Sequence, residues 1–104
     1  MSCYFVSRHA GAVDWARDQG IEATLIEHLD PTLIKAGDMV LGTLPIHLVA
    51  AITAKGARYL HLELEVPLAQ RGEPLSASAM VRYGAKLVEY RAERITSGSS
   101  GVGS

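Results

Sequence analysis

Two short apolar runs that do not alternate with polar residues constrain the fold of this chain more than any other feature. They cover residues 3–7 and 39–43. A strand without alternation is covered on both faces, as in the centre of a parallel sheet that lies between two layers of helices. The two runs therefore predict an α/β fold with helices between the strands.

Segments of helical length do separate the expected strands. One helix is predicted over residues 11–19, and a second over residues 45–56, where Pro45 suits the first turn. The second helix is apolar nearly all round, so it should be deeply covered. A last, long helix is predicted over residues 76–95, because its large apolar side chains fall on one helical stripe. These side chains are Met80, Tyr83, Leu87 and Tyr90.

Two further strands complete the predicted sheet. Residues 23–29 form one, and residues 58–66 alternate, which predicts one wet face near a sheet edge or at an interface. The order β-α-β-β-α-β-α predicts a small Rossmann-like three-layer sandwich, with a mainly parallel four-stranded sheet in the order 2-1-3-4. One domain covers residues 1–96, and the Gly- and Ser-rich residues 97–104 form a flexible tail.

Composition excludes several classes of partner and cofactor. The 104 residues carry ten basic and eleven acidic side chains, a net charge of −1, which argues against binding to duplex DNA. No apolar run approaches the length of a membrane span, so no membrane helix is predicted, and the first residues do not predict a signal peptide. The single Cys3 fits a reducing cytoplasm. The four histidines lack zinc-site spacing and no phosphate-binding glycine motif occurs, so neither a metal nor a cofactor is predicted.

Polar residues follow two strands whose carboxyl ends should be neighbours. Ser7, Arg8 and His9 end the first run, and Gly42-Thr43-Leu44-Pro45 ends the third, with His47 in the next helical turn. Helix N-termini and a guanidinium suit a phosphate, and histidine exchanges protons near neutral pH. His28 ends the second strand on the same edge. We therefore predict an anion site at this edge of the sheet.

Each of these residues also has a purely structural interpretation. Thr43 suits a helix cap, His47 a satisfied structural histidine, His61 the wet face of its strand, and Trp15 the core. The sequence R-H-A-G at residues 8–11 is close to the R-H-G motif of histidine phosphatases. The chain is short for that fold, however, and lacks a second arginine–histidine set in the right order.

Three segments together resemble a small family of type III CRISPR-associated accessory proteins, viewed as ring nucleases with a minimal CARF-like Rossmann fold. They are YFVSRHAGAVDWARDQG, GDMVLGTLPIHLVAAITAKGARYLHLELEVP and RYGAKLVEYRAERI, and the resemblance covers roughly residues 3–95. It implies cleavage of a cyclic oligoadenylate second messenger, foremost cyclic tetra-adenylate, which would switch off the antiviral response. It also implies a homodimer that holds the ring at its two-fold axis.

The expected chemistry needs no protein nucleophile and no metal, because a ribose 2′-OH can attack the adjacent phosphorus. The protein would position that hydroxyl, accept its proton and stabilise the developing charge. His9 is the first candidate for the base, His47 the second, and Arg8 the charge stabiliser. The expected substrate-binding residues are Ser7, Gly11, Gly42, Thr43, Leu44 and Pro45. A binding module that only sequesters the ring remains the alternative.

Overall fold

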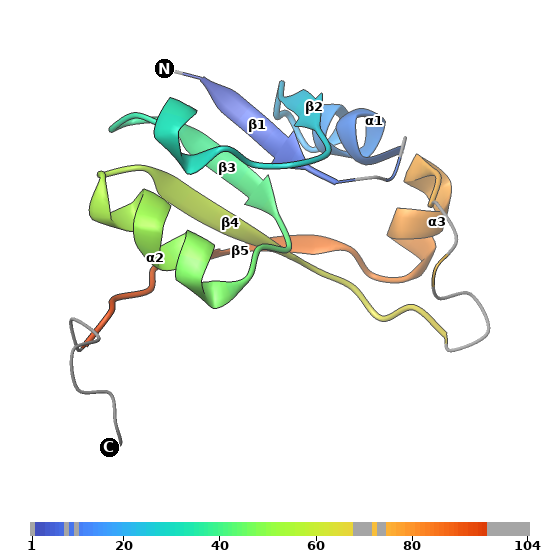
Figure 1. The fold of residues 1–104 in the computed structure, drawn as a ribbon. Helices are drawn as coiled ribbons and strands as arrows, with labels where there is room; N and C mark the ends of the chain where they lie inside the picture. The colour runs from blue at the N-terminus through green and yellow to red at the C-terminus, as the bar shows by residue number, and fades with distance from the viewer. Residues whose placement is uncertain (1, 8, 10, 68–71, 73–74, 96–104) are drawn as a thin grey trace.

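The computed structural model describes residues 2–7, 9, 11–67, 72 and 75–95 (Figure 1). The predicted tail lies outside the described residues. The elements are, in chain order, β1 (Cys3–Val6), α1 (Gly11–Asp18), β2 (Thr24–Ile26), the short 3-10 helix η1 (Pro31–Leu33), β3 (Met39–Gly42), α2 (Ile46–Ala54), β4 (Arg58–Glu63), α3 (Ala77–Arg82) and β5 (Lys86–Tyr90).

The sheet has five strands in the order β2-β1-β3-β4-β5. The first four strands run parallel, and β5 pairs with β4 in the antiparallel direction. The predicted order of the four parallel strands is therefore confirmed. The sheet as a whole is mixed, because a fifth strand forms where the sequence predicted a helix.

The predicted long helix over residues 76–95 is wrong. α3 ends at Arg82, Gly84 adopts a φ of 73°, and the chain turns back as β5. Glycine adopts this left-handed conformation without the cost that a side chain would bring, so Gly84 ends the helical segment. The apolar stripe is divided between two elements that face the same core: Met80 is buried on α3, and Leu87 packs from β5.

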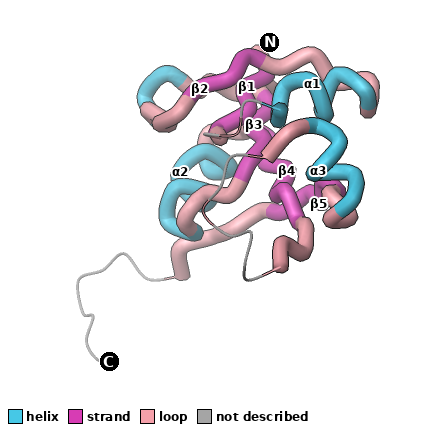
Figure 2. The backbone as a smooth tube through the Cα atoms, turned by 90° about the vertical axis from the view of Figure 1, so that its right-hand side faces the viewer, coloured by secondary structure: helices cyan, strands magenta, loops and turns pink. Residues whose placement is uncertain are grey.

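Helices cover both faces of the sheet, which gives the three layers that the sequence predicted. Figures 1 and 2 show α1 and α3 together on one face and α2 on the other. The first face buries a cluster that includes Phe5, Trp15, Leu41 and Met80. The second face buries a cluster that includes Val40, Ile52 and Tyr59. Adjacent residues of β3 thus enter opposite cores, as a strand without alternation requires.

Two expectations about exposure need correction. α2 is less covered than its apolar sequence suggests: Val49 and Ile52 are buried, whereas Ile46 is 77% exposed. β4 is not an edge strand, because β5 occupies its outer side. Its predicted wet face includes Tyr59, which is only 2% exposed, because this face packs beneath α2.

Candidate functional site

The carboxyl ends of β1 and β3 lie side by side at one edge of the sheet. Val6 and Gly42 are register partners, and Gly42 has a φ of 142°. A Cβ on Gly42 would lie 2.4 Å from the carbonyl oxygen of Val6, so this approach needs glycine. The chain leaves β1 through α1 toward β2 and leaves β3 through α2 toward β4, on the opposite face. Open α/β sheets bind ligands at such a switch point.

A pocket of about 610 Å³ opens at this edge, and we call it the rim pocket. It brings together residues from the ends of β1, β2, β3 and β4. The described residues that line it are Val6, Ser7, His9, Glu27, His28, Gly42, Thr43, Leu62 and Leu64. Four of the predicted site residues, Ser7, His9, Gly42 and Thr43, therefore meet in one place.

Other predicted site residues lie away from the rim pocket. His47 is exposed on α2 and borders a separate hollow beside Arg91. Leu44 faces a pocket on the α2 side of the sheet. Pro45 occupies the N-cap position of α2, and no side chain caps that helix end, so Thr43 is not its cap. Arg8 lies outside the described residues.

The segment before α3 holds His9 in place. The Leu75 N–H donates to Nδ1 of His9 over 3.0 Å, and the Leu75 carbonyl accepts from the Gly11 N–H over 3.2 Å. A Cβ on Gly11 would lie 2.4 Å from the Ala77 nitrogen, so glycine is required here. The His9 N–H in turn donates to Oγ of Ser7 over 3.0 Å. Gly11 is a predicted substrate-binding residue, and its N–H is engaged by the protein itself.

The Leu75 contact determines which nitrogen of His9 carries the proton. Nδ1 accepts a hydrogen bond, so in the neutral ring the proton is on Nε2. In this tautomer Nε2 donates and does not accept. The base role predicted for His9 would require the Leu75 hydrogen bond to break first.

His61, which was predicted to lie on the solvent-exposed face of its strand, is also a residue of this edge. It is the register partner of Gly42, so it lies beside the end of β3. Two further pockets border it. The β4 pocket, which includes Thr43, Glu65 and Lys86, shares residues with the rim pocket. The tyrosine pocket, about 360 Å³ in volume, lies on the α2 side between Tyr90 and Ile46.

The alternating pattern of residues 58–66 identified the strand that carries His61 but not the end of that strand. The predicted strand ran to residue 66, which put His61 in its middle. β4 ends at Glu63, so His61 lies close to the carboxyl end, where ligands bind in this class of fold.

A comparison with protein-family models matches residues 4–93 to the family described as "Putative CRISPR-associated protein (Cas_VVA1548)". The chain belongs to this family. The match covers all of the described strands and helices except the first residue of β1, and it includes His9, His61 and the rim pocket. Neither the curated proteins nor the solved structures give a match to the chain.

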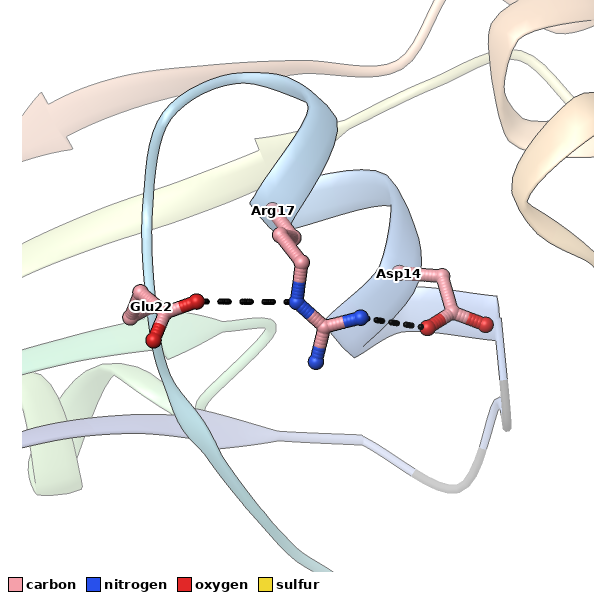
Figure 3. A network of polar contacts seen from close by, with 3 residues as sticks. All are labelled: Asp14, Arg17 and Glu22. Carbon is pink, nitrogen blue, oxygen red and sulfur yellow. Dashed lines mark hydrogen bonds and ion pairs between the residues drawn. The ribbon is translucent and has the colours of Figure 1, made fainter.

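In this member of the Cas_VVA1548 family, the described lining of the rim pocket has little charge. Its ionisable side chains are Glu27, His9 and His28. Arg17 of α1 is engaged elsewhere, with Asp14 at 3.2 Å and Glu22 at 3.5 Å (Figure 3). These side chains are exposed, so their ion pairs add little to stability. The described lining residues of the rim pocket include no arginine or lysine, and Lys86 lies in the adjoining β4 pocket.

Metal ligation and membrane insertion were both predicted to be absent. Within the part of the chain that the structure describes, no three His, Cys, Asp or Glu side chains are grouped as metal ligands would be. Over the same residues, every helix is too short or too polar to span a bilayer.

Proposed function

We propose that this CRISPR-associated protein binds a cyclic oligoadenylate at the rim pocket and cleaves it as a metal-independent ring nuclease. The single observation that carries the proposal is the rim pocket itself, at the switch point between β1 and β3. Membership of a CRISPR-associated family supports a role in antiviral signalling. The preferred substrate is cyclic tetra-adenylate.

The cleavage step uses a nucleophile that the substrate supplies. The ribose 2′-oxygen forms a bond to the adjacent phosphorus, the bond from phosphorus to the 5′-oxygen breaks, and the 2′ proton passes to a base. The product is linear, with a 2′,3′-cyclic phosphate at one end and a 5′-hydroxyl at the other. The protein contributes alignment and charge stabilisation, which together can supply much of the rate enhancement.

The residues at the rim are expected to bind the phosphates of the ring. Ser7 and Thr43 offer hydroxyl groups to phosphate oxygens, and Arg8 offers a charged fork. The ring has several phosphates, whereas one chain offers one rim pocket. We therefore expect a homodimer that places two rim pockets around the same ring.

A binding module that sequesters the ring is the second candidate, and one observation favours it. Nδ1 of His9 is engaged by Leu75, so His9 binds as a donor more readily than it removes a proton. The same hydrogen bond argues against a histidine phosphatase, because Nε2 needs a lone pair to attack phosphorus.

Turnover separates the two candidates. Catalytic amounts of protein are incubated with cyclic tetra-adenylate in the presence of a chelator, and the products are separated by chromatography. Many turnovers to a product with a 2′,3′-cyclic phosphate support the nuclease. Stoichiometric retention of intact ring supports the binding module. Linear tetra-adenylate serves as the control ligand, and a protein that neither binds nor cleaves the ring contradicts both candidates.

A further inference from the structure

The Tyr59 hydroxyl connects the rim to the α2 face of the sheet. Its oxygen lies 2.9 Å from the Gly42 carbonyl oxygen, 2.9 Å from the Leu44 nitrogen and 2.6 Å from Nδ1 of His61. Burial raises the pKa of this hydroxyl, while the hydrogen bond from Leu44 lowers it in part. At neutral pH the phenol is therefore uncharged and carries one proton.

The proton of the Tyr59 hydroxyl can go to the Gly42 carbonyl or to Nδ1 of His61, whereas the Leu44 N–H only donates to the phenol oxygen. In the arrangement in which the phenol donates to Gly42, its oxygen accepts from the His61 ring, and the neutral ring carries its proton on Nδ1. The lone pair of the neutral ring is then on Nε2. In this tautomer His61 is an acceptor at Nε2, whereas His9 is a donor.

Nε2 of His61 is available to a ligand. Among the described residues, Nε2 has no hydrogen-bond partner. Every buried side-chain nitrogen of these residues has a partner, so Nε2 is not buried and can be reached from solvent. Two tyrosines hold the imidazole ring of His61 in place. Tyr59 and Tyr90 both contact it edge-on, with ring centroids 5.8 Å and 5.7 Å from that of His61. The Tyr90 hydroxyl itself donates to Glu63 over 2.6 Å.

We propose that the bound ring extends from the rim pocket into the adjoining β4 pocket, which His61 lines, that Nε2 of His61 is the base that accepts the ribose 2′ proton, and that Tyr59 fixes it in the competent tautomer. This inference rests on the proposed function. The proton moves from the 2′-OH to Nε2 as the new bond to phosphorus forms. The 5′-oxygen leaves and takes a proton from water, and the imidazolium returns its proton to solvent. No other reactant is needed.

The tautomer is measured without any substrate. In long-range ¹H–¹⁵N spectra of the protein at a pH where the histidines are neutral, His61 should show the Nδ1–H form and His9 the Nε2–H form. In Tyr59→Phe the His61 preference should be lost. Tyr4→Phe is the matched control, because Tyr4 packs on the same face and has no hydroxyl hydrogen bond within the described residues. An Nε2–H form of His61 in the wild type overturns the inference.

The base role is tested by single-turnover cleavage. His61→Asn keeps an N–H near Tyr59 but has no group at Nε2, so its rate should fall at least tenfold while ring binding and thermal stability change little. His61→Ala should fall as far, and added imidazole should restore part of its rate. Tyr59→Phe should slow cleavage more than it weakens binding, and Tyr4→Phe should match the wild type.

The outcomes separate this inference from the function on which it rests. If the wild type cleaves the ring and His61→Asn cleaves it equally fast, the base role is overturned and the ring nuclease stands. If the wild type does not cleave, the proposed function fails and the base role fails with it.

Discussion

Two histidines at one edge of the sheet each have Nδ1 engaged by a neighbour. The backbone N–H of Leu75 donates to Nδ1 of His9, whereas Nδ1 of His61 lies 2.6 Å from the hydroxyl oxygen of Tyr59, which accepts from it in the proposed tautomer. Sequence alone located His9 at a strand end but offered no means of assigning its proton. The partner that decides it, Leu75, lies 66 residues further along the chain.

Replacement of Arg8 by alanine should weaken ring binding by about 1.5–3 kcal/mol, the usual loss for a charge-assisted hydrogen bond. The reason is that Arg8 is the only arginine or lysine within residues 7–9 and 42–47, which were predicted to form the site. Calorimetric titration with cyclic tetra-adenylate measures the change. Arg17→Ala is the control, because Arg17 pairs with Asp14 and Glu22 on α1. Equal affinities of the two variants would remove Arg8 from the site.

Asp38 should make the stability of the protein depend on pH in the acidic range. Its buried carboxylate accepts from the N–H groups of Ser2 and Lys35, each at 2.9 Å, and these bonds hold the pKa of Asp38 below its usual value. The stabilisation is complete above the unfolded value of about 3.9 and is lost as the pH falls through the lower folded value. Thermal unfolding of the wild type and Asp38→Asn should therefore differ at pH 7 and converge under acid. A difference that stays constant into strong acid would contradict this.

At the scale of the elements, glycine determines where the strands and helices can meet. Gly42 permits the close approach of β1 and β3, and Gly11 permits that of α1 and the segment before α3. Neither contact can be read from the local sequence, because the group that would clash belongs to a distant segment. Gly84 could have been interpreted correctly, since a glycine within an expected helix is a common stop signal.

The elements up to β4 and the order of the parallel strands were predicted correctly, because the elements depend on local pattern and the handedness of β-α-β units restricts the possible strand orders. The fifth strand was not, because Leu87, Val88 and Tyr90 fit both a helical stripe and a strand. Its pairing with β4 decides the matter, supported by the two hydrogen bonds between Arg58 and Glu89. Such pairing joins residues that are distant in the sequence, so a short segment of sequence does not reveal it.

Substitution of Gly42 by alanine should destabilise the protein by about 3 kcal/mol or more, since it combines backbone strain with a clash against Val6. Gly20→Ala is a matched control. Gly20 has a φ of 86°, and a Cβ added there would meet no atom within 4 Å, so this variant carries the strain alone, about 1–2 kcal/mol. Chemical denaturation measures both. Equal losses of unfolding free energy in the two variants would show that the structure adjusts to the clash with Val6 without loss of stability.

At the scale of the whole molecule, the proposed function requires two chains around one ring. Light scattering should therefore give about twice the chain mass of 11.1 kDa. Ile46, which is 77% exposed where α2 begins beside the rim, offers an apolar side chain to such an interface. Ile46→Lys should weaken the dimer and leave the monomer fold intact.

Leu33→Lys is the control for this measurement. Leu33 is 65% exposed in η1, and η1 lies at the other end of α2, where the Lys55 ammonium binds the Pro31 carbonyl. The Leu33→Lys variant should dimerise like the wild type. A wild type that stays monomeric with and without ligand would contradict the dimer.

The reciprocal hydrogen bonds between Leu75 and residues 9–11 also have a consequence for the order of assembly during synthesis. A ribosome releases β1 and the start of α1 first, but the partner that orients His9 arrives only with the last third of the chain. A nascent chain that stops short of Leu75 can pair β1 with β3 and still has an incomplete rim. The edge of the sheet that is proposed to bind the ligand is thus completed late, after the long-range contact has formed.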